Sequence, residues 1–257
     1  MSATGPVGRP RHAFAPIGGA KNSNNEDSAV PLQGIVFDMD GTLCEKGEPQ
    51  NYMFAEMRSA ISIPKNVDIL DHIHSLSERD QKSAFAAIQD IERRAMANQV
   101  PQAGLVSLME FLDRHGIKKG ICTRNFDAPV THLLEKHLPS HIDAFHPIVT
   151  RDFRPPKPSP AGILHIAHAW GVTKTAEVPA SPPEERPLGL IMVGDSTDDV
   201  VSGYEAGALT VLLRSEGKED IEKDERTDVV ISRLDELIGL LQKGIKSRRV
   251  IQTTDTD

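Results

Sequence analysis

The chain has 257 residues, with 29 Lys and Arg against 37 Asp and Glu, and therefore a formal net charge of −8. The length suits one large domain, or one domain with an insertion, and an apolar share of 39% excludes wholesale disorder. No apolar run approaches the roughly 18 residues that a membrane-spanning helix needs, and the acidic balance argues against nucleic-acid or anionic-membrane binding, which needs clustered Lys and Arg.

The two ends of the chain differ in composition from the rest. Residues 1–30 are rich in Gly, Pro, Ala, Asn and Ser and show almost no apolar periodicity, which predicts a disordered tail. Basic residues but no acidic residue precede Glu26, so a mitochondrial transit peptide is an alternative. We expect a cytoplasmic location, because Cys44 and Cys122 are too few for a disulfide framework and suit a reducing compartment. The polar residues 244–257 predict a second loose tail.

The first structured segment combines one strand with a helical stretch. Residues 34–37 are apolar and β-branched, which predicts a buried strand that ends at Asp38. The following residues, 45–102, contain no convincing strand but show three segments with helical periodicity. These segments are residues 52–61, 67–76 and 78–98. We predict that residues 45–102 form a small all-helical cap inserted after the first strand.

From residue 105 onward, helical and strand patterns alternate, as in a parallel sheet covered by helices on both faces. The predicted helices cover residues 105–114, 129–138 and 159–170, and the predicted strands cover residues 117–122, 147–150, 188–193, 209–213 and 228–231. The predicted fold class is therefore α/β, with a Rossmann-like three-layer parallel sheet core formed by residues 31–44 and 103–243. Within this core, the proline-rich residues 173–187 predict a flexible surface loop.

Two carboxylates follow the first predicted strand, in the sequence Asp38-Met39-Asp40-Gly41-Thr42. An ionised Asp is a nucleophile at neutral pH, so Asp38 can attack phosphorus without a separate base. Asp40 can act as the acid on the leaving oxygen, because a neighbouring carboxylate raises its pKa. The structural alternative is a strand that ends in an ordinary Asp-Gly turn. The pair of acids favours phosphoryl-transfer chemistry over that alternative.

Two further polar groups follow predicted strands, at the sheet edge where α/β proteins bind ligands. Thr123, with Arg124 and Asn125 behind it, offers a hydroxyl and backbone amides to a phosphoryl oxygen. Lys157 lies in a proline-stiffened loop before a predicted helix, where its ammonium could neutralise both a phosphate and Asp38. Taken alone, a Thr at a strand end is usually structural, and a Lys in a loop is usually solvated.

An acidic run, Gly-Asp-Ser-Thr-Asp-Asp at residues 194–199, follows a later predicted strand. Asp195 could bind a hard cation opposite Asp38, and two carboxylates with water and substrate oxygens suit Mg²⁺. Asp199 lies about one helical turn further on and could orient the ligands or a lysine. The four groups occur in order at strand ends, which predicts that they form one active site.

These four motifs resemble those of the haloacid dehalogenase-like superfamily of phosphatases, and the resemblance covers the core from about residue 33 to residue 241. It implies that Asp38 is the nucleophile, that Asp40 is the general acid/base, and that Lys157 stabilises charge. It also implies a magnesium ion held by Asp38, the carbonyl of Asp40 and Asp195. Asp199 is then the supporting acid of the last motif.

The resemblance also extends to the phosphate-binding motif and to the cap. It implies that Thr123 binds the substrate phosphate, assisted by Arg124 and Asn125, which stand where many relatives have Asn and Lys. The predicted helical cap stands where the phosphoglycolate phosphatase-like members carry theirs. We expect a compact lid that leaves the pocket more open than in those relatives.

The function expected from this resemblance is magnesium-dependent hydrolysis of a small phosphomonoester through an aspartyl-phosphate intermediate. Dehalogenases of the superfamily lack the second Asp, so Asp40 points to phosphoryl transfer. A phosphomutase shares the motif and is an alternative, as is a phosphatase of isoprenoid phosphates. A non-enzymatic scaffold predicts the loss of a catalytic residue, whereas all are present. The expected partner is therefore a small phosphate ester, with no nucleic acid and no membrane.

Overall fold

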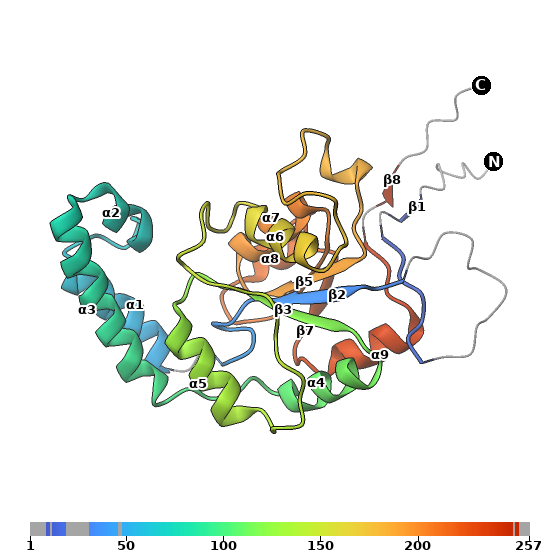
Figure 1. The fold of residues 1–257 in the computed structure, drawn as a ribbon, viewed down its shortest axis with the longest axis horizontal. Helices are drawn as coiled ribbons and strands as arrows, with labels where there is room; N and C mark the ends of the chain where they lie inside the picture. Colours follow the sequence, from blue (N-terminus) through green and yellow to red (C-terminus); the bar gives the residue numbers. More distant parts are fainter. Residues whose placement is uncertain (1–8, 11, 19–30, 46–47, 249, 252–257) are drawn as a thin grey trace.

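The computed structural model describes residues 9–10, 12–18, 31–45, 48–248 and 250–251. Its core is a six-stranded parallel sheet with the strand order β4-β3-β2-β5-β6-β7 (Figure 1). The strands are β2 Gly34–Phe37, β3 Lys118–Cys122, β4 Ile148–Val149, β5 Leu190–Gly194, β6 Leu209–Leu213 and β7 Val229–Ile231. Helices pack on both faces of this sheet, so the predicted α/β fold class is confirmed.

Each central strand divides its side chains between two helical layers, because neighbouring residues of a strand point to opposite faces. Ile35 and Phe37 of β2 join one buried cluster, while Val36 joins another. The first cluster includes residues of the helices α4 Leu105–Arg114, α5 Asp127–His137 and α9 Glu236–Lys243. The second includes residues of α6 Ala161–Ala169 and α7 Thr197–Ala206. Burial on both faces explains the continuous apolar runs of β2 and β5.

Three helices stand between β2 and α4, and the described residues of this segment form no strand. They are α1 Glu48–Ala60, α2 Ile69–Ser75 and α3 Glu78–Met96, which we call the cap helices. They share a small apolar cluster that includes Met57, Ile73 and Ile88. The two connections between the cap helices and the core lie side by side, because the N–H of Glu45 donates to the carbonyl of Val100 over 2.8 Å.

Residues 12–18 and 244–248 belong to the two tails that we expected to be loose. In the structure these two segments pair with each other and pack on the core. Phe14 is 2% exposed and joins the larger core cluster, and its N–H donates to the carbonyl of Ile245 over 2.8 Å. Beyond them, β1 Arg9–Pro10 pairs antiparallel with β8 Val250–Ile251. A single apolar residue such as Phe14 has no periodicity, so its burial depends on the pairing of two distant segments. The rest of both predicted tails lies outside the described residues.

The proline-rich residues 173–187 contain one short 3₁₀-helix, Pro183–Glu185. At the end of this loop, Arg186 donates to the carbonyls of Glu205 and Ala206 over 2.6 and 3.1 Å. The flexibility of the loop stays a prediction, as do the boundaries of the core (31–44 and 103–243) and the cap (45–102). Within the described part of the chain, no helix has both the length and the hydropathy that crossing a membrane requires.

Candidate active site

The carboxyl end of β2 delivers Asp38 and Asp40 to the edge of the sheet. β2 is buried along its whole length, and the ladder continues one residue further because the N–H of Asp38 donates to the carbonyl of Val193 over 2.9 Å. Gly41 then adopts a φ of 87°, a left-handed conformation that favours glycine and turns the chain back. Asp38 is consequently only 7% exposed, whereas Asp40 is half-buried.

β5 delivers the second set of acids, and the start of α7 fixes their positions. Ser196 caps α7, and the Oδ2 atom of Asp199 accepts hydrogen bonds from the Ser196 hydroxyl over 2.5 Å and from the Ser196 N–H over 3.0 Å. The same oxygen accepts from the N–H of Asp195 over 3.2 Å. A Cβ on Gly194 would lie 2.2 Å from the Cβ of Asp199, so this close approach requires glycine. Asp195 and Asp199 are both 1% exposed.

Lys157 joins the acids of the two strand ends. Its ammonium donates to Oδ1 of Asp38 over 2.7 Å and to Oδ1 of Asp199 over 2.5 Å. Burial works against the charge of Lys157, but the two carboxylates outweigh it and hold its pKa above the ordinary value. Burial also raises the pKa of Asp38 to about 7, with a further contribution from Asp199 and opposition from Lys157. An additional cation beside Asp38 would favour the ionised form that burial disfavours.

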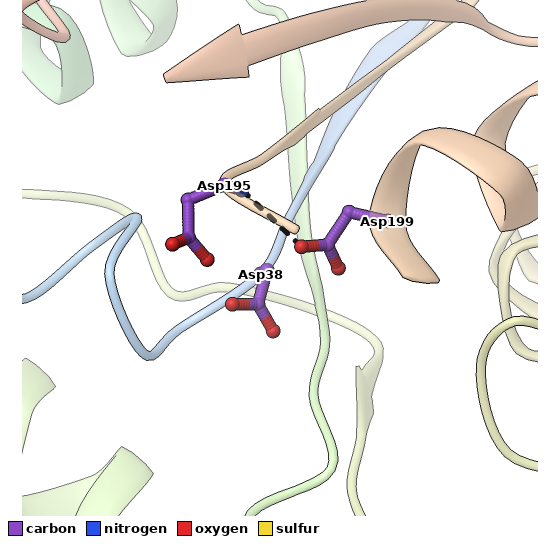
Figure 2. Close-up of side chains that lie close together, drawn as sticks. All are labelled: Asp38, Asp195 and Asp199. Atoms are coloured by element: carbon purple, nitrogen blue, oxygen red, sulfur yellow. Dashed lines mark hydrogen bonds between the residues drawn. The ribbon is translucent and has the colours of Figure 1, made fainter. Parts of the chain in front are cut away.

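Three carboxylates meet at this point (Figure 2). Oxygen atoms of Asp38, Asp195 and Asp199 all lie within 4.8 Å of one another, and Asp199 reaches the group from α7. Both oxygens of Asp199 already accept hydrogen bonds, one from Lys157 and the other from Ser196. Asp38 and Asp195 are the candidate cation ligands, and the carboxylate of Asp195 also accepts a hydrogen bond from Lys218 over 2.8 Å. Their all-oxygen donor set fits a divalent cation that keeps several water ligands, as Mg²⁺ does.

The end of β3 brings Thr123 and Asn125 into the same site. Thr123 is 4% exposed, and its hydroxyl oxygen accepts a hydrogen bond from the N–H of Asn125 over 3.1 Å. The side-chain amide of Asn125 donates through Nδ2 to Oδ2 of Asp40 over 3.0 Å. The motif around Thr123 is thus connected directly to the second acid of the β2 motif.

Arg124 lies at the border between the core and the cap. Its guanidinium donates to Asp198 of α7 over 2.8 Å and to Asp68 over 2.7 Å. Asp68 is the N-cap residue of α2, where its Oδ1 accepts the N–H of Leu70 over 2.9 Å. Arg124 lines the same cavity as Asp38 and links a cap helix to the core, and its contact with a substrate phosphate stays a prediction.

A cavity of about 290 Å³ lies between the cap helices and the edge of the sheet. Its core side carries the residues described above: Asp38, Asp40, Thr123, Lys157 and Asp195. Its cap side carries five apolar residues and three charged ones: Phe54, Met57, Ile69, Leu70 and Ile88, with Arg58, Asp68 and Glu92. The cavity therefore offers a charged end for a phosphoryl group and a mainly hydrocarbon wall for the rest of a ligand.

Three charged residues around the site were not expected there. Glu92 of α3 and Arg151, which follows β4, form a buried ion pair in the cavity wall. Lys218, which precedes the short helix α8 Glu219–Lys223, donates to the carboxylate of Asp195 over 2.8 Å. Arg151 gives a weak signal in the sequence, since it makes the loop before Lys157 locally basic. Glu92 and Lys218 lie in polar stretches that carry no local signal.

Comparison with known proteins gives relatives in both sequence and fold. The sequence profile of haloacid dehalogenase-like hydrolases matches residues 32–207. An uncharacterized hydrolase of Saccharomyces cerevisiae is 44% identical over 215 residues, which cover 82% of this chain and 91% of that protein. A haloacid dehalogenase-like hydrolase domain-containing protein of Arabidopsis thaliana is 34% identical over 195 residues, 73% of each chain. The crystal structure of a predicted phosphoglycolate phosphatase from Haemophilus somnus shares the fold, with a TM-score of 0.59 at 17% identity, over 82% of this chain and 98% of that one.

Proposed function

This chain belongs to the haloacid dehalogenase-like hydrolase family, and on this premise we propose that it hydrolyses a small phosphomonoester with magnesium through an aspartyl phosphate. The observation that carries the proposal is the meeting of Asp38, Asp195 and Lys157 in the wall of one cavity. In-line attack on a phosphoryl group needs a fixed nucleophile and concentrated positive charge, and this arrangement supports both. A shared fold alone would not distinguish among the many chemistries that such folds carry.

Asp38 is the nucleophile in this mechanism. Lys157 holds its Oδ1, and its Oδ2 attacks the phosphorus atom opposite the leaving oxygen. The attack forms a bond from phosphorus to Oδ2 and breaks the bond from phosphorus to the alcohol oxygen. Water then attacks the phosphorus of the aspartyl phosphate, which releases inorganic phosphate and restores the carboxylate of Asp38.

Asp40 is the general acid and base of the two steps. It gives its proton to the departing alcohol oxygen and then takes a proton from the attacking water. Its half-buried carboxyl lines the cavity, and Asn125 donates to its Oδ2. The Sγ of Cys44 lies 3.9 Å from Oδ1 of Asp40, and because a thiol is a weaker donor than an amide, we assign the transferable proton to Oδ1.

We assign the cation to the carboxylates of Asp38 and Asp195 together with the backbone carbonyl of Asp40. A bound magnesium ion supplies positive charge to the phosphoryl oxygens. Asp199 supports this set because it holds both the ammonium of Lys157 and the N–H of Asp195. Its removal would therefore disturb the geometry of the site without removing a ligand.

Thr123 and Lys157 bind the transferred phosphoryl group. The hydroxyl of Thr123 accepts the N–H of Asn125, so its own proton can be donated to a phosphoryl oxygen. The buried ammonium of Lys157 offsets the negative charge that develops during the attack. Asn125 and Arg124 contribute indirectly in this proposal, through Asp40 and the cap respectively.

The cavity limits the substrate class. A volume of about 290 Å³ suits a small ester better than a macromolecule. The apolar wall of cap residues, which includes Ile69, Leu70 and Ile88, favours a leaving group with a hydrocarbon surface. This wall favours an isoprenoid phosphate as a second candidate substrate. The cytoplasmic location and the absence of nucleic-acid and membrane partners stay predictions.

The proposal is tested with the purified full chain and a panel of phosphate esters. The panel contains small sugar phosphates, nucleoside monophosphates and isoprenyl phosphates, and the release of inorganic phosphate is measured with and without Mg²⁺. We expect release from at least one ester only when Mg²⁺ is present. We expect Asp38→Asn to lower kcat by about 10³-fold or more, because it removes the nucleophile while keeping the shape of the side chain.

The matched control is Asp220→Asn, the same chemical change on an exposed residue of α8, and we expect wild-type kcat from it. Thermal unfolding of both variants shows whether they are folded. Turnover by folded Asp38→Asn contradicts the aspartyl-phosphate mechanism. Undiminished turnover by wild type after treatment with a chelator contradicts the assignment of magnesium.

A further inference from the structure

A buried ion pair crosses from the cap to the core beside the active site. Glu92 of the cap helix α3 is 6% exposed, and Arg151, which follows β4 in the core, is 4% exposed. The Nη2 atom of Arg151 donates to Oε1 of Glu92, and both residues line the cavity. The contact therefore forms only when α3 lies against the core.

Arg151 also contacts the residue that holds Asp40. Its Nη2 donates to Oδ1 of Asn125 over 3.3 Å, and the N–H of Phe126 donates to the same oxygen over 2.8 Å. These two donors fix the carbonyl side of the amide, so Nδ2 faces Asp40 and donates to it over 3.0 Å. A reversed amide would place two acceptor oxygens against each other. The Arg151 guanidinium lies 5.2 Å from the centroid of the Phe126 ring, which restricts its position further.

Stability does not explain the ion pair. Replacement of a buried ion pair by apolar residues of similar volume is often neutral or stabilising. In this pair, Nε and Nη1 of Arg151 and Oε2 of Glu92 are buried without a hydrogen-bond partner among the described residues. Buried donors and acceptors that stay unpaired destabilise the folded state. The contact of Arg151 with Asn125 points instead to a role in the reaction.

We propose that Glu92 of the cap is a positioning residue for Asp40. It acts through Arg151 and Asn125, whose side-chain amide donates to Oδ2 of Asp40 and so helps to set where the carboxyl group of Asp40 points. The proposal rests on the proposed function, in which Asp40 protonates the leaving oxygen. It adds that this proton transfer depends on the docking of α3, because the chain of contacts begins on the cap.

The test uses the double variant Glu92→Leu/Arg151→Met. It replaces the ion pair by two apolar side chains of similar volume, so the core can stay packed while Asn125 loses its contact with Arg151. Two substrates are compared. One is p-nitrophenyl phosphate, whose alcohol is acidic and leaves without a proton, and the other is glycerol 3-phosphate, whose alcohol needs one. The kcat/KM value is measured because it reports the steps up to the attack by Asp38. The later hydrolysis of the aspartyl phosphate, which is the same for both substrates, does not affect it.

We expect the double variant to lose about 10-fold or more of kcat/KM with glycerol 3-phosphate, within the usual contribution of a general acid, and much less with p-nitrophenyl phosphate. The conservative variant Glu92→Gln keeps an acceptor for Arg151 and should restore the wild-type ratio of the two substrates. The control Glu56→Gln makes the same change in another ion pair of the cap, with the exposed Arg94, and should leave the ratio unchanged.

The outcomes separate this proposal from the one on which it rests. An equal loss with both esters, or no loss in a double variant that unfolds at the wild-type temperature, overturns the positioning role and leaves the phosphatase proposal intact. If the wild type hydrolyses neither ester and no member of the earlier panel, both the positioning role and the phosphatase proposal are overturned. A Glu56→Gln variant with the same ester-dependent loss would also overturn the positioning role, because the effect would then belong to the cap in general.

Discussion

Burial is the main cause of the unusual pKa values of two carboxyl groups in this site. It raises the pKa of Asp38 to about 7, and it raises the pKa of Glu92 to about 7 as well. Each group has a cation beside it, Lys157 or Arg151, that lowers the pKa without cancelling the effect of burial. A buried carboxyl that keeps its proton near neutrality makes the stability of the folded protein depend on pH.

The first prediction concerns Glu92. Its folded pKa of about 7 lies above its ordinary value of 4.5, so between these pH values the folded protein binds the proton that the unfolded chain releases. The stabilisation is thus complete below about pH 4.5 and is lost as the pH rises through 7. Relative to Glu92→Gln, wild type should lose about 3 kcal/mol of unfolding free energy across this window. Urea titrations at pH 5, 6, 7 and 8 measure the difference, and a pH-independent difference would contradict the prediction.

The acids at the strand ends could be predicted from the sequence residue by residue, but the ion pairs between different elements could not. Asp38 and Asp195 each follow an apolar run, and parallel strands place their carboxyl ends at one edge, so a local pattern was enough. Glu92 and Arg151 are 59 residues apart in the chain and belong to different elements. No local pattern relates them, because their contact is decided by how the cap docks.

At the scale of elements, two ion pairs among the described residues join the cap helices to the core, and they differ in burial. The pair between Arg124 and Asp68 is partly open to solvent, with side chains 27% and 37% exposed. The pair between Arg151 and Glu92 is almost fully buried, with side chains 4% and 6% exposed. Solvent screens the first pair and hardly screens the second, so the two should contribute differently to stability.

The second prediction compares Arg124→Gln with Arg151→Gln. The first change removes a screened link and should cost less than about 1 kcal/mol of unfolding free energy. The second leaves the Glu92 carboxyl buried without its cation and should cost about 3 kcal/mol at pH 8. Urea unfolding of the two variants, followed by circular dichroism, measures both values. Equal losses would show that burial does not separate the two links.

The same element-scale view explains why the ends of the chain were harder to predict than the sheet. β2, β5 and β6 are buried on both faces, so β2 and β5 appear in the sequence as uninterrupted apolar runs and β6 as a run broken only by Thr210. Residues 12–18 contribute only scattered apolar side chains, such as Phe14, and their backbone partners lie near the other end of the chain. Pairing between such distant segments leaves no periodic pattern in either one.

At the scale of the whole molecule, the net charge of −8 describes the surface and not the site. Four basic residues line the cavity: Arg58, Arg124, Arg151 and Lys157. Carboxylates line it too, and two of them, Asp38 and Asp195, meet beside the buried Asp199 at one corner. An anionic substrate therefore needs a cation at that corner, and composition alone could not have shown where the cation would lie.

The last prediction follows from this balance and requires no turnover. A ligand that binds only the folded state raises the unfolding free energy, by about 2.7 kcal/mol at 100 times its Kd. Millimolar Mg²⁺ should therefore raise the unfolding temperature of the wild type by several degrees. Asp195→Asn should lose this shift, because it removes one of the two carboxylate ligands, whereas Glu56→Gln on the exposed face of the cap should keep it.

The shift should also depend on pH, since protons and the cation compete for the carboxylate of Asp38. With the pKa of Asp38 at about 7 in the absence of a cation, the group is mostly protonated at pH 5.5 and mostly ionised at pH 8. The stabilisation by Mg²⁺ should consequently be larger at pH 8 than at pH 5.5. A shift that is equal at both pH values, or that persists in Asp195→Asn, would place the bound cation somewhere other than between Asp38 and Asp195.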